Sequence, residues 1–130
     1  MHHQRFSPRA EYRQQENQRV NDSANLADRF RDLKSLTVDL AHFAPERLTK
    51  TSEIKYTVNL AHAKSVFRFN CTNDECVGGD FDLSAALANA IAAHHTTASG
   101  EVICQGWRSK TSIDHAPCHN ILRYRLSLAY

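Results

Sequence analysis

The chain lacks the features that would place it in a membrane or export it. Its 130 residues contain no apolar run that approaches the roughly 20 residues needed to span a bilayer. Residues 1–10 are polar and basic, without the apolar core of a signal peptide. We therefore expect a cytoplasmic protein with no membrane partner. Four cysteines in such a reducing compartment favour metal or redox chemistry over disulfides.

Motifs of known catalytic sites are also missing. The sequence contains no His-Glu-x-x-His, no glycine-rich phosphate loop and no Gly-x-Ser-x-Gly. Pro117 and Cys118 match the second half of a zinc deaminase signature, but Ile121 stands where that signature requires cysteine. A Cys104 or Cys118 nucleophile assisted by His119 would need a geometry that adjacency in sequence does not provide. We expect no enzymatic activity and no small-molecule substrate.

An excess of charge of one sign is absent as well. The formal net charge is +2, whereas nucleic-acid-binding domains are usually strongly basic. The distribution is nevertheless uneven, because residues 71–103 carry only acidic charges and residues 105–130 carry mostly basic ones. A local basic surface is therefore still compatible with the sequence. The acidic side chains are those of Asp74, Glu75, Asp80, Asp82 and Glu101, and the basic ones those of Arg108, Lys110, Arg123 and Arg125.

The length and composition predict one domain preceded by an arm. With 130 residues, 42% of them hydrophobic, the chain is too short for two independent cores. Residues 1–25 are rich in arginine and amides and contain few large apolar side chains, too few to offset the entropy of ordering them. We predict a flexible, transiently helical arm over residues 1–25 and a single domain over residues 26–130. Leu26, Phe30 and Leu33 recur at helical spacing and predict a short helix leading into that domain.

Alternating apolar and polar residues predict the strands. Residues 36–41 and 54–60 alternate on either side of a polar turn at 44–52, which is typical of an antiparallel hairpin. A third strand over residues 65–71 places Phe67, Phe69 and Cys71 on one face. The last strand is predicted to run from Cys118 to Tyr130.

One helix stands out between the cysteines. Alanine, leucine and isoleucine dominate the residues after Asp82 or Ser84, either of which can be the N-cap, and the helix is expected to end before a turn at residues 96–100. We therefore predict an α+β fold, in which one main helix packs on one face of a small antiparallel sheet of four to five strands.

The cysteines give the strongest chemical signal. Two pairs, Cys71 with Cys76 and Cys104 with Cys118, lie in or next to predicted turns that flank the helix. Thiolates from separated turns are the usual ligands of a tetrahedral structural zinc ion, and four-thiolate sites also accept iron. We predict that these four residues bind Zn²⁺, which pins the helix to the sheet. The alternatives are buried unpaired thiols or one or two disulfides.

Residues beside the cysteines have predicted supporting roles. Gly78 and Gly79 let the backbone curl so that amides can point at the sulfur atoms. Gly106 closes a tight turn, and Trp107 covers the site with apolar surface. His119 is adjacent to Cys118, but neighbouring side chains in a strand point to opposite faces, so the two should not both bind the metal.

The remaining histidines are expected to have ordinary roles. His94 and His95 follow the predicted helix, where imidazoles interact favourably with its negative end. Three others lie in or near predicted loops and are expected to be solvated or locally hydrogen-bonded. These are His42, His62 and His115.

This cysteine and glycine pattern resembles small zinc-ribbon or treble-clef domains. The resemblance covers about half the chain and is one of architecture, and the cysteine spacings differ from the usual two intervening residues. It implies a structural zinc site and a function in binding nucleic acid or protein, or as a subunit adaptor. The residues that carry it are Cys71, Cys76, Gly78, Gly79, Cys104, Gly106 and Cys118.

Three functional hypotheses follow. We expect most a non-enzymatic protein-interaction, assembly or regulatory module, whose protein partner is unknown and docks on the arm or on a strand edge. The first alternative is a nucleic-acid-binding module in which Trp107 or Tyr124 stacks on bases and the arginines of the arm help to contact phosphates. The second is a thiol redox sensor that releases its metal on oxidation. The side chains expected to form the phosphate-binding face are Lys55, Arg68, Arg123 and Arg125.

Overall fold

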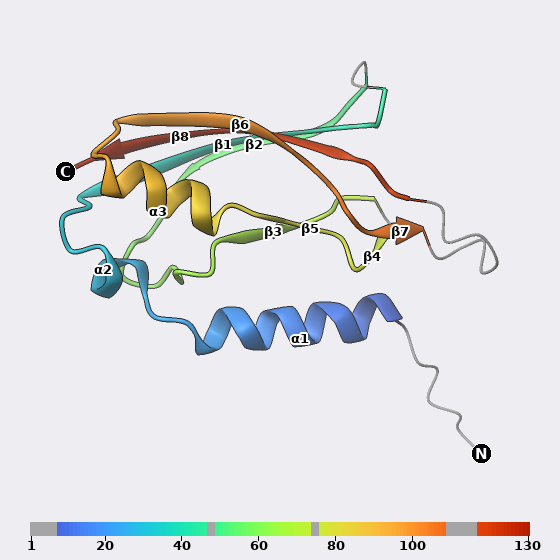
Figure 1. Ribbon diagram of the computed structural model, residues 1–130, viewed down its shortest axis with the longest axis horizontal. Helices are drawn as coiled ribbons and strands as arrows, with labels where there is room; N and C mark the ends of the chain where they lie inside the picture. The colour runs from blue at the N-terminus through green and yellow to red at the C-terminus, as the bar shows by residue number, and fades with distance from the viewer. Residues whose placement is uncertain (1–7, 47–48, 74–75, 109–116) are drawn as a thin grey trace.

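The computed structural model describes residues 8–46, 49–73, 76–108 and 117–130 (Figure 1). Within them the chain forms three helices and eight strands. The helices are α1 (Pro8–Asp22), α2 (Leu26–Arg29) and α3 (Ser84–Ala92). The strands are β1 (Ser35–Phe43), β2 (Lys50–Thr57), β3 (Arg68–Asn70), β4 (Cys76–Val77), β5 (Asp80–Asp82), β6 (Thr97–Ile103), β7 (Trp107–Arg108) and β8 (Ile121–Ala129).

Four of the strands form the main sheet. Their order is β2-β1-β8-β6, and every neighbouring pair is antiparallel. The central strands β1 and β8 are nine residues long and pair along their whole length, from Ser35 opposite Ala129 to Phe43 opposite Ile121. The predicted α+β class and the predicted hairpin of the first two strands are confirmed.

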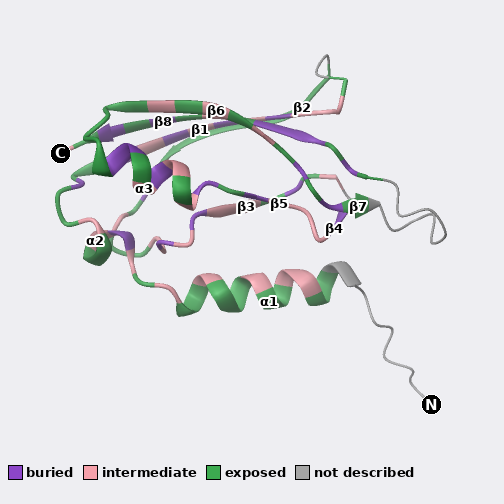
Figure 2. Ribbon diagram, in the orientation of Figure 1, coloured by how far each residue is buried: buried purple, intermediate pink, exposed green. Residues whose placement is uncertain are grey.

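The core lies between this sheet and α3. Alternate residues of β1, from Leu36 to His42, are buried, so their side chains share one face of the sheet. Figure 2 shows α3 next to the sheet, with buried positions on both. Leu87 and Ile91 of α3 pack in the same apolar cluster. The hydroxyl of Tyr130 donates a hydrogen bond to the carbonyl oxygen of His95 at 2.8 Å, which ties the end of the chain to the residues after α3.

The prediction of a turn at residues 96–100 is wrong. Residues 97–103 form the edge strand β6, which pairs with β8 in regular register. Gly100, inside the predicted turn, stands opposite Tyr124 in this pair of strands, and a Cβ atom on it would lie 2.6 Å from the tyrosine oxygen. The glycine therefore marks a close approach of a side chain to a strand.

Other strand boundaries also differ from the prediction, and the third strand, β3, covers only residues 68–70 of the predicted 65–71. Strand β2 begins at Lys50, inside the predicted turn at 44–52, and ends at Thr57. A register shift where β1 passes from His42 to Phe43 accommodates the extra residue. The last strand begins at Ile121, so Cys118 precedes it.

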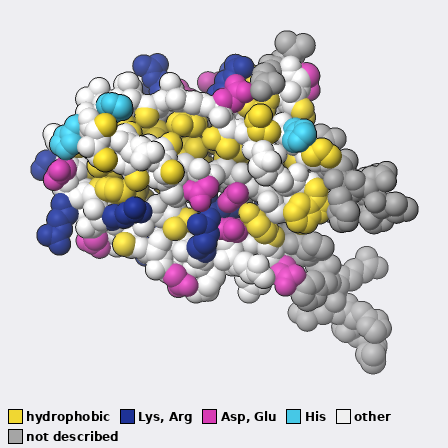
Figure 3. Space-filling view, viewed as in Figure 1, with side chains coloured by type: hydrophobic (Ala, Val, Ile, Leu, Met, Phe, Trp, Pro, Cys, Tyr) yellow, Lys and Arg dark blue, Asp and Glu magenta, His cyan; other side chains and the backbone are white. Residues whose placement is uncertain are grey.

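Residues 8–22, within the predicted arm, form α1, which lies beside β3 and β5 (Figure 1). The Arg68 side chain is 3% exposed, and its Nε lies 2.7 Å from Asp80 of β5 and 3.7 Å from Glu16 of α1. Figure 3 shows acidic and basic side chains gathered between α1 and these strands. The helix is thus held by charged contacts, which the low apolar content of residues 1–25 could not indicate. A flexible arm that ends at residue 25 stays a prediction.

None of the helices in the described ranges is long and apolar enough to cross a lipid bilayer.

Candidate metal centre

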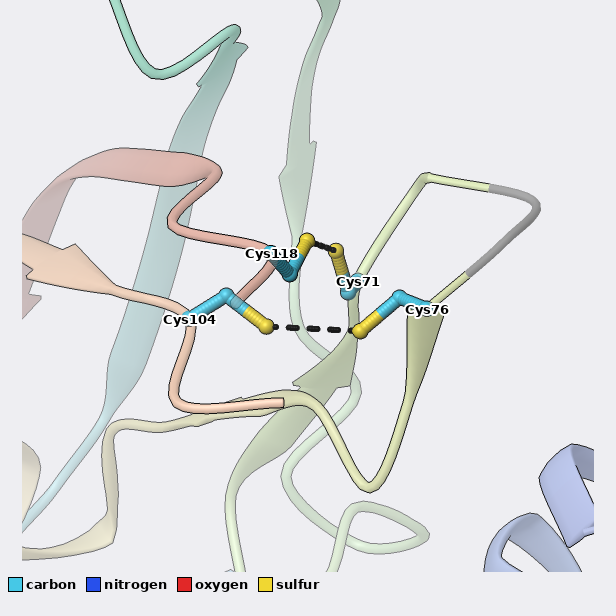
Figure 4. A group of neighbouring side chains, drawn as sticks. All are labelled: Cys71, Cys76, Cys104 and Cys118. Carbon is cyan, nitrogen blue, oxygen red and sulfur yellow. Dashed lines mark hydrogen bonds between the residues drawn. The ribbon is translucent and has the colours of Figure 1, made fainter. Parts of the chain in front are cut away.

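The four predicted cysteines converge at one point of the structure (Figure 4). Their Sγ atoms all lie within 4.8 Å of one another, and the side chains point inward from four different segments. The Sγ atoms of Cys71 and Cys118 are 3.6 Å apart, and those of Cys76 and Cys104 are 3.5 Å apart. Each of the four residues is at most 3% exposed. Residues far apart in sequence therefore form one buried cluster of sulfur atoms.

These distances distinguish a metal site from disulfides. A disulfide requires an S–S distance of roughly 2.05 Å, so the four cysteines are free thiols. In a tetrahedral site with Zn–S bonds of roughly 2.3 Å, the sulfur atoms are separated by roughly 3.8 Å. The observed cluster has this size, and its donor set consists only of sulfur. The residues present therefore fit a four-thiolate metal ion.

Two small pairs of strands hold the cysteines in place. Cys71 directly follows β3, which pairs with β5, and Cys76 begins β4, which pairs with β7. Cys104 follows β6, and Cys118 comes shortly before β8. The backbone N–H of Cys118 donates to the carbonyl oxygen of Gly106 at 3.0 Å. Each pair has only two or three residues per strand, too short for alternation to reveal it in the sequence.

Two glycines let the backbone pass close to the sulfur atoms. A Cβ atom on Gly79 would collide with the Sγ atoms of both Cys76 and Cys104. A Cβ atom on Gly106 would lie 2.7 Å from the Cys76 Sγ and 2.6 Å from the backbone nitrogen of Gly79. Both positions therefore require glycine on steric grounds.

Gly78 and Trp107 form a separate contact at the rim of the site. Gly78 has a φ of 68°, and a Cβ atom there would lie 2.6 Å from the indole ring of Trp107. The indole thus packs on the glycine and remains 39% exposed.

Polar groups point at the sulfur atoms. The backbone N–H of Gly106 donates to the Cys104 Sγ at 3.4 Å, and the Asn73 side-chain amide donates to the Cys118 Sγ at 3.6 Å. Such bonds orient thiolates and offset part of their charge. The backbone N–H of Cys104 donates to the backbone carbonyl oxygen of Asn120 at 2.8 Å, which fixes the main chain at Cys104. Sequence reasoning missed Asn73, although its position between two cysteines was a usable signal.

The pKa values of two of these thiols, Cys71 and Cys76, are raised in the absence of a cation. Desolvation, together with the charge of Cys71, raises the pKa of Cys76 from 9.0 to about 12. A hydrogen bond with Cys104, together with desolvation, raises the pKa of Cys71. A divalent cation reverses this preference because it stabilises the thiolate forms directly and displaces their protons.

His119 does not contribute to the sulfur cluster. Its side chain is exposed and its backbone has a φ of 54°, so the chain turns between Cys118 and the start of β8. The expected separation of the two side chains holds, but the cause is this turn and not strand alternation.

None of the other histidines within the described residues joins the four sulfur atoms. His42, expected in or near a loop, lies in β1, where burial lowers its pKa. The ring of His94 stacks on Tyr130 with centroids 4.4 Å apart. His62 follows β2 in a turn and is exposed. His115 lies outside the described residues.

The basic residues predicted to form one face are divided by the structure. Lys55, Arg123 and Arg125 lie on the outer face of the sheet, the face opposite α3, on strands that flank β1. Arg68 lies on β3 instead, where its side chain contacts Asp80 of β5. Its assignment to this face is therefore wrong. Trp107 lies at the cysteine end of the molecule.

Comparison with family models, with curated proteins and with solved structures finds no match to this chain.

Proposed function

We propose that this chain is a non-enzymatic protein in which Cys71, Cys76, Cys104 and Cys118 bind a structural zinc ion, and that it acts as a protein-interaction or assembly module. The convergence of four buried Sγ atoms within 4.8 Å carries the proposal. Without a metal, the burial of four thiols beside such short strand pairs would add little stability through apolar packing.

The donor set supports a structural role for the ion. Four thiolates complete a tetrahedral shell and leave no position for a water molecule or a substrate, unlike catalytic zinc sites with three protein ligands. Cys104 and Cys118 have no exposed surface, so nothing in solution can reach them directly. Iron fits the same thiolates, and elemental analysis separates the two metals.

The charges on the outer face of the sheet favour a protein partner over nucleic acid. Arg123 donates to Glu101 at 3.0 Å, and Asp39 lies in register between Lys55 and Arg125. Three basic side chains therefore share this face with the acidic side chains of Asp39, Glu53 and Glu101. A phosphate backbone would meet acidic as well as basic side chains there.

Burial of the sulfur atoms also weighs against a redox sensor. Sensor cysteines are solvent-accessible, whereas each of these is at most 3% exposed.

Elemental analysis of protein purified without added metal tests the proposal. We expect one zinc per chain in the wild type and none in Cys104→Ser. Leu126→Ala is the matched control, since it also removes a buried side chain but lies away from the cysteines, and it should retain the metal. A wild-type chain without bound metal would contradict the proposal. So would an intact chain that recovers no protein partner, a second copy included, in a pull-down from cell extract.

A further inference from the structure

Among the described residues, no further strand pairs with the outer side of β2. Strand β2 is the first strand in the order β2-β1-β8-β6, and all eight of its residues are exposed (Figure 2). The N–H of Val58 donates to the carbonyl oxygen of Leu36, which fixes the phase of the ladder between β1 and β2. Because bonding alternates along antiparallel strands, the backbone groups of Glu53 and Lys55 point away from β1. They are therefore free to pair with another strand.

The apolar covering of the core stops before it reaches this strand. Leu40 of β1 is 2% exposed, whereas Ile54, directly opposite on the same face, is 53% exposed. Tyr56, opposite the fully buried Val38, is 36% exposed. Two large apolar side chains thus face the core side of the sheet without being covered, at an edge that can accept a strand.

The charges of β2 are complementary to the same strand running in the opposite direction. When two copies pair antiparallel with Ile54 opposite Ile54, Glu53 of each faces Lys55 of the other, and Ser52 faces Tyr56. Shifting the register to place Glu53 opposite Glu53, or Lys55 opposite Lys55, puts like charges at the centre. Cross-strand pairs of opposite charge stabilise a sheet, and like pairs destabilise it. The charge pattern therefore favours one register.

We propose that a second copy of this chain docks on β2, pairing residues 52–56 of both chains around Ile54 into one continuous sheet. The proposal rests on the proposed function as an interaction module and names its partner. In this arrangement Glu53 and Lys55 pair on the outer face, and Ile54 and Tyr56 of the two chains cover one another on the inner face. The two-fold symmetry makes the contact close on itself, which limits assembly to a dimer.

The same strand shows what competes with this contact. Glu53 accepts a hydrogen bond from Lys50 of its own strand at 2.9 Å. Both side chains are about half exposed, so this pair is weakened by solvent and leaves the second carboxylate oxygen of Glu53 available. Lys55 forms no salt bridge with any described residue. The partner's Glu53 would supply one.

Charge exchange tests the proposed register. We expect light scattering to give twice the mass of one chain for the wild type, dissociating at low protein concentration. Glu53→Lys or Lys55→Glu alone should weaken association by about tenfold or more, because each substitution creates two like-charge pairs in the dimer. The double variant, in which the two charges are exchanged, should restore it. Mixing the two single variants should also restore it, as a heterodimer.

Matched controls separate the register from net charge. Glu11→Lys on α1 and Lys34→Glu before β1 change the net charge by the same amounts at exposed positions away from β2 and should leave association unchanged. A wild-type monomer at all concentrations would overturn the proposal. A dimer that ignores both single exchanges would overturn it too, since its contact would lie elsewhere. The recovery of a foreign protein strand on β2 in place of a second copy would also overturn it.

Metal content measured on the same samples keeps the two proposals distinct. A monomer with one zinc per chain that still captures another protein contradicts only the dimer. A chain that lacks zinc but dimerises with the charge dependence described above contradicts only the metal site.

Discussion

The two ends of this molecule are held together by different forces. In the main sheet, β1 and β8 pair over nine residues and bury a continuous apolar face against α3. At the cysteine end, β4 pairs with β7 through only two residues, and the four buried sulfur atoms lie beside this short pair. Hydrophobic burial and a long hydrogen-bond ladder are sufficient to explain the first end, but not the second.

If the proposed ion is bound, the cysteine end should depend on it and the main sheet should not. Isolated strand pairs of this length are not stable in water. Four thiolates bound to one cation would link four segments of the chain: those after β3 and β6, the start of β4, and the residues before β8. Because those segments also connect the strands of the main sheet, the metal would order the cysteine end without forming the core itself.

Metal removal should have the largest effect on stability, and this effect should be confined to the cysteine end. Structural zinc sites contribute roughly 10–16 kcal/mol of binding free energy, so chelation should strongly lower the stability of the cysteine end. Hydrogen exchange followed by mass spectrometry should show lost protection for β4 and β7, while β1 and β8 retain most of theirs. Equal loss of protection at both ends would show that the chain is a single cooperative unit.

A core substitution in the main sheet should have a smaller effect on stability. It should act on the sheet and not on the cysteine end. Leu126 is fully buried in β8, so Leu126→Ala should lower the free energy of unfolding by about 2–5 kcal/mol through lost burial and a cavity. Ser127→Ala, next to it but exposed, should change it by less than about 0.5 kcal/mol. Denaturant unfolding measures both variants. Loss of bound metal from folded Leu126→Ala would mean that the two ends are coupled.

The sequence was informative where one signal was strong. Regular alternation from Leu36 onward and from Ile121 to the C-terminus predicted the two central strands, and the alanine-rich segment after Ser84 predicted α3. The cysteines were predicted to converge because thiols separated by strands and a helix have few other roles inside a reduced protein. Their convergence needed no knowledge of the strands around them.

Prediction failed where the stabilising partner is distant in sequence. Gly100 lies in a strand that pairs with β8, where the side chain of Tyr124 occupies the space that a Cβ atom would fill. The burial of Arg68 depends on Asp80 and on a helix more than 45 residues earlier in the chain. The exposure of Ile54 depends on how far the apolar covering extends over the sheet. None of these is readable from local periodicity.

Helix α1 is held by a third kind of contact, because polar groups join it to the cysteine end. Arg13 donates to the carbonyl oxygen of Cys71 at 3.4 Å, and Arg19 lies 3.3 Å from Asp82. Both contacts are partly exposed and individually weak. Tyr12, also on α1, is the group whose titration reports whether the helix is docked.

Tyr12 should give the smallest effect. Burial, then the negative charges of Asp80 and Glu16, raise the pKa of Tyr12 from 10.0 to about 12. A pKa raised by folding means that the folded protein holds this proton more tightly, so the associated stability is complete below pH 10 and is lost as the pH rises towards 12. Phenolate absorbance should therefore contain a component near pH 12 that Tyr12→Phe removes and that Gln14→Ala, on the exposed side of α1, preserves. If residues 1–25 are instead a flexible arm, this component should ionise near pH 10, because neither burial nor the two carboxylates would act on it.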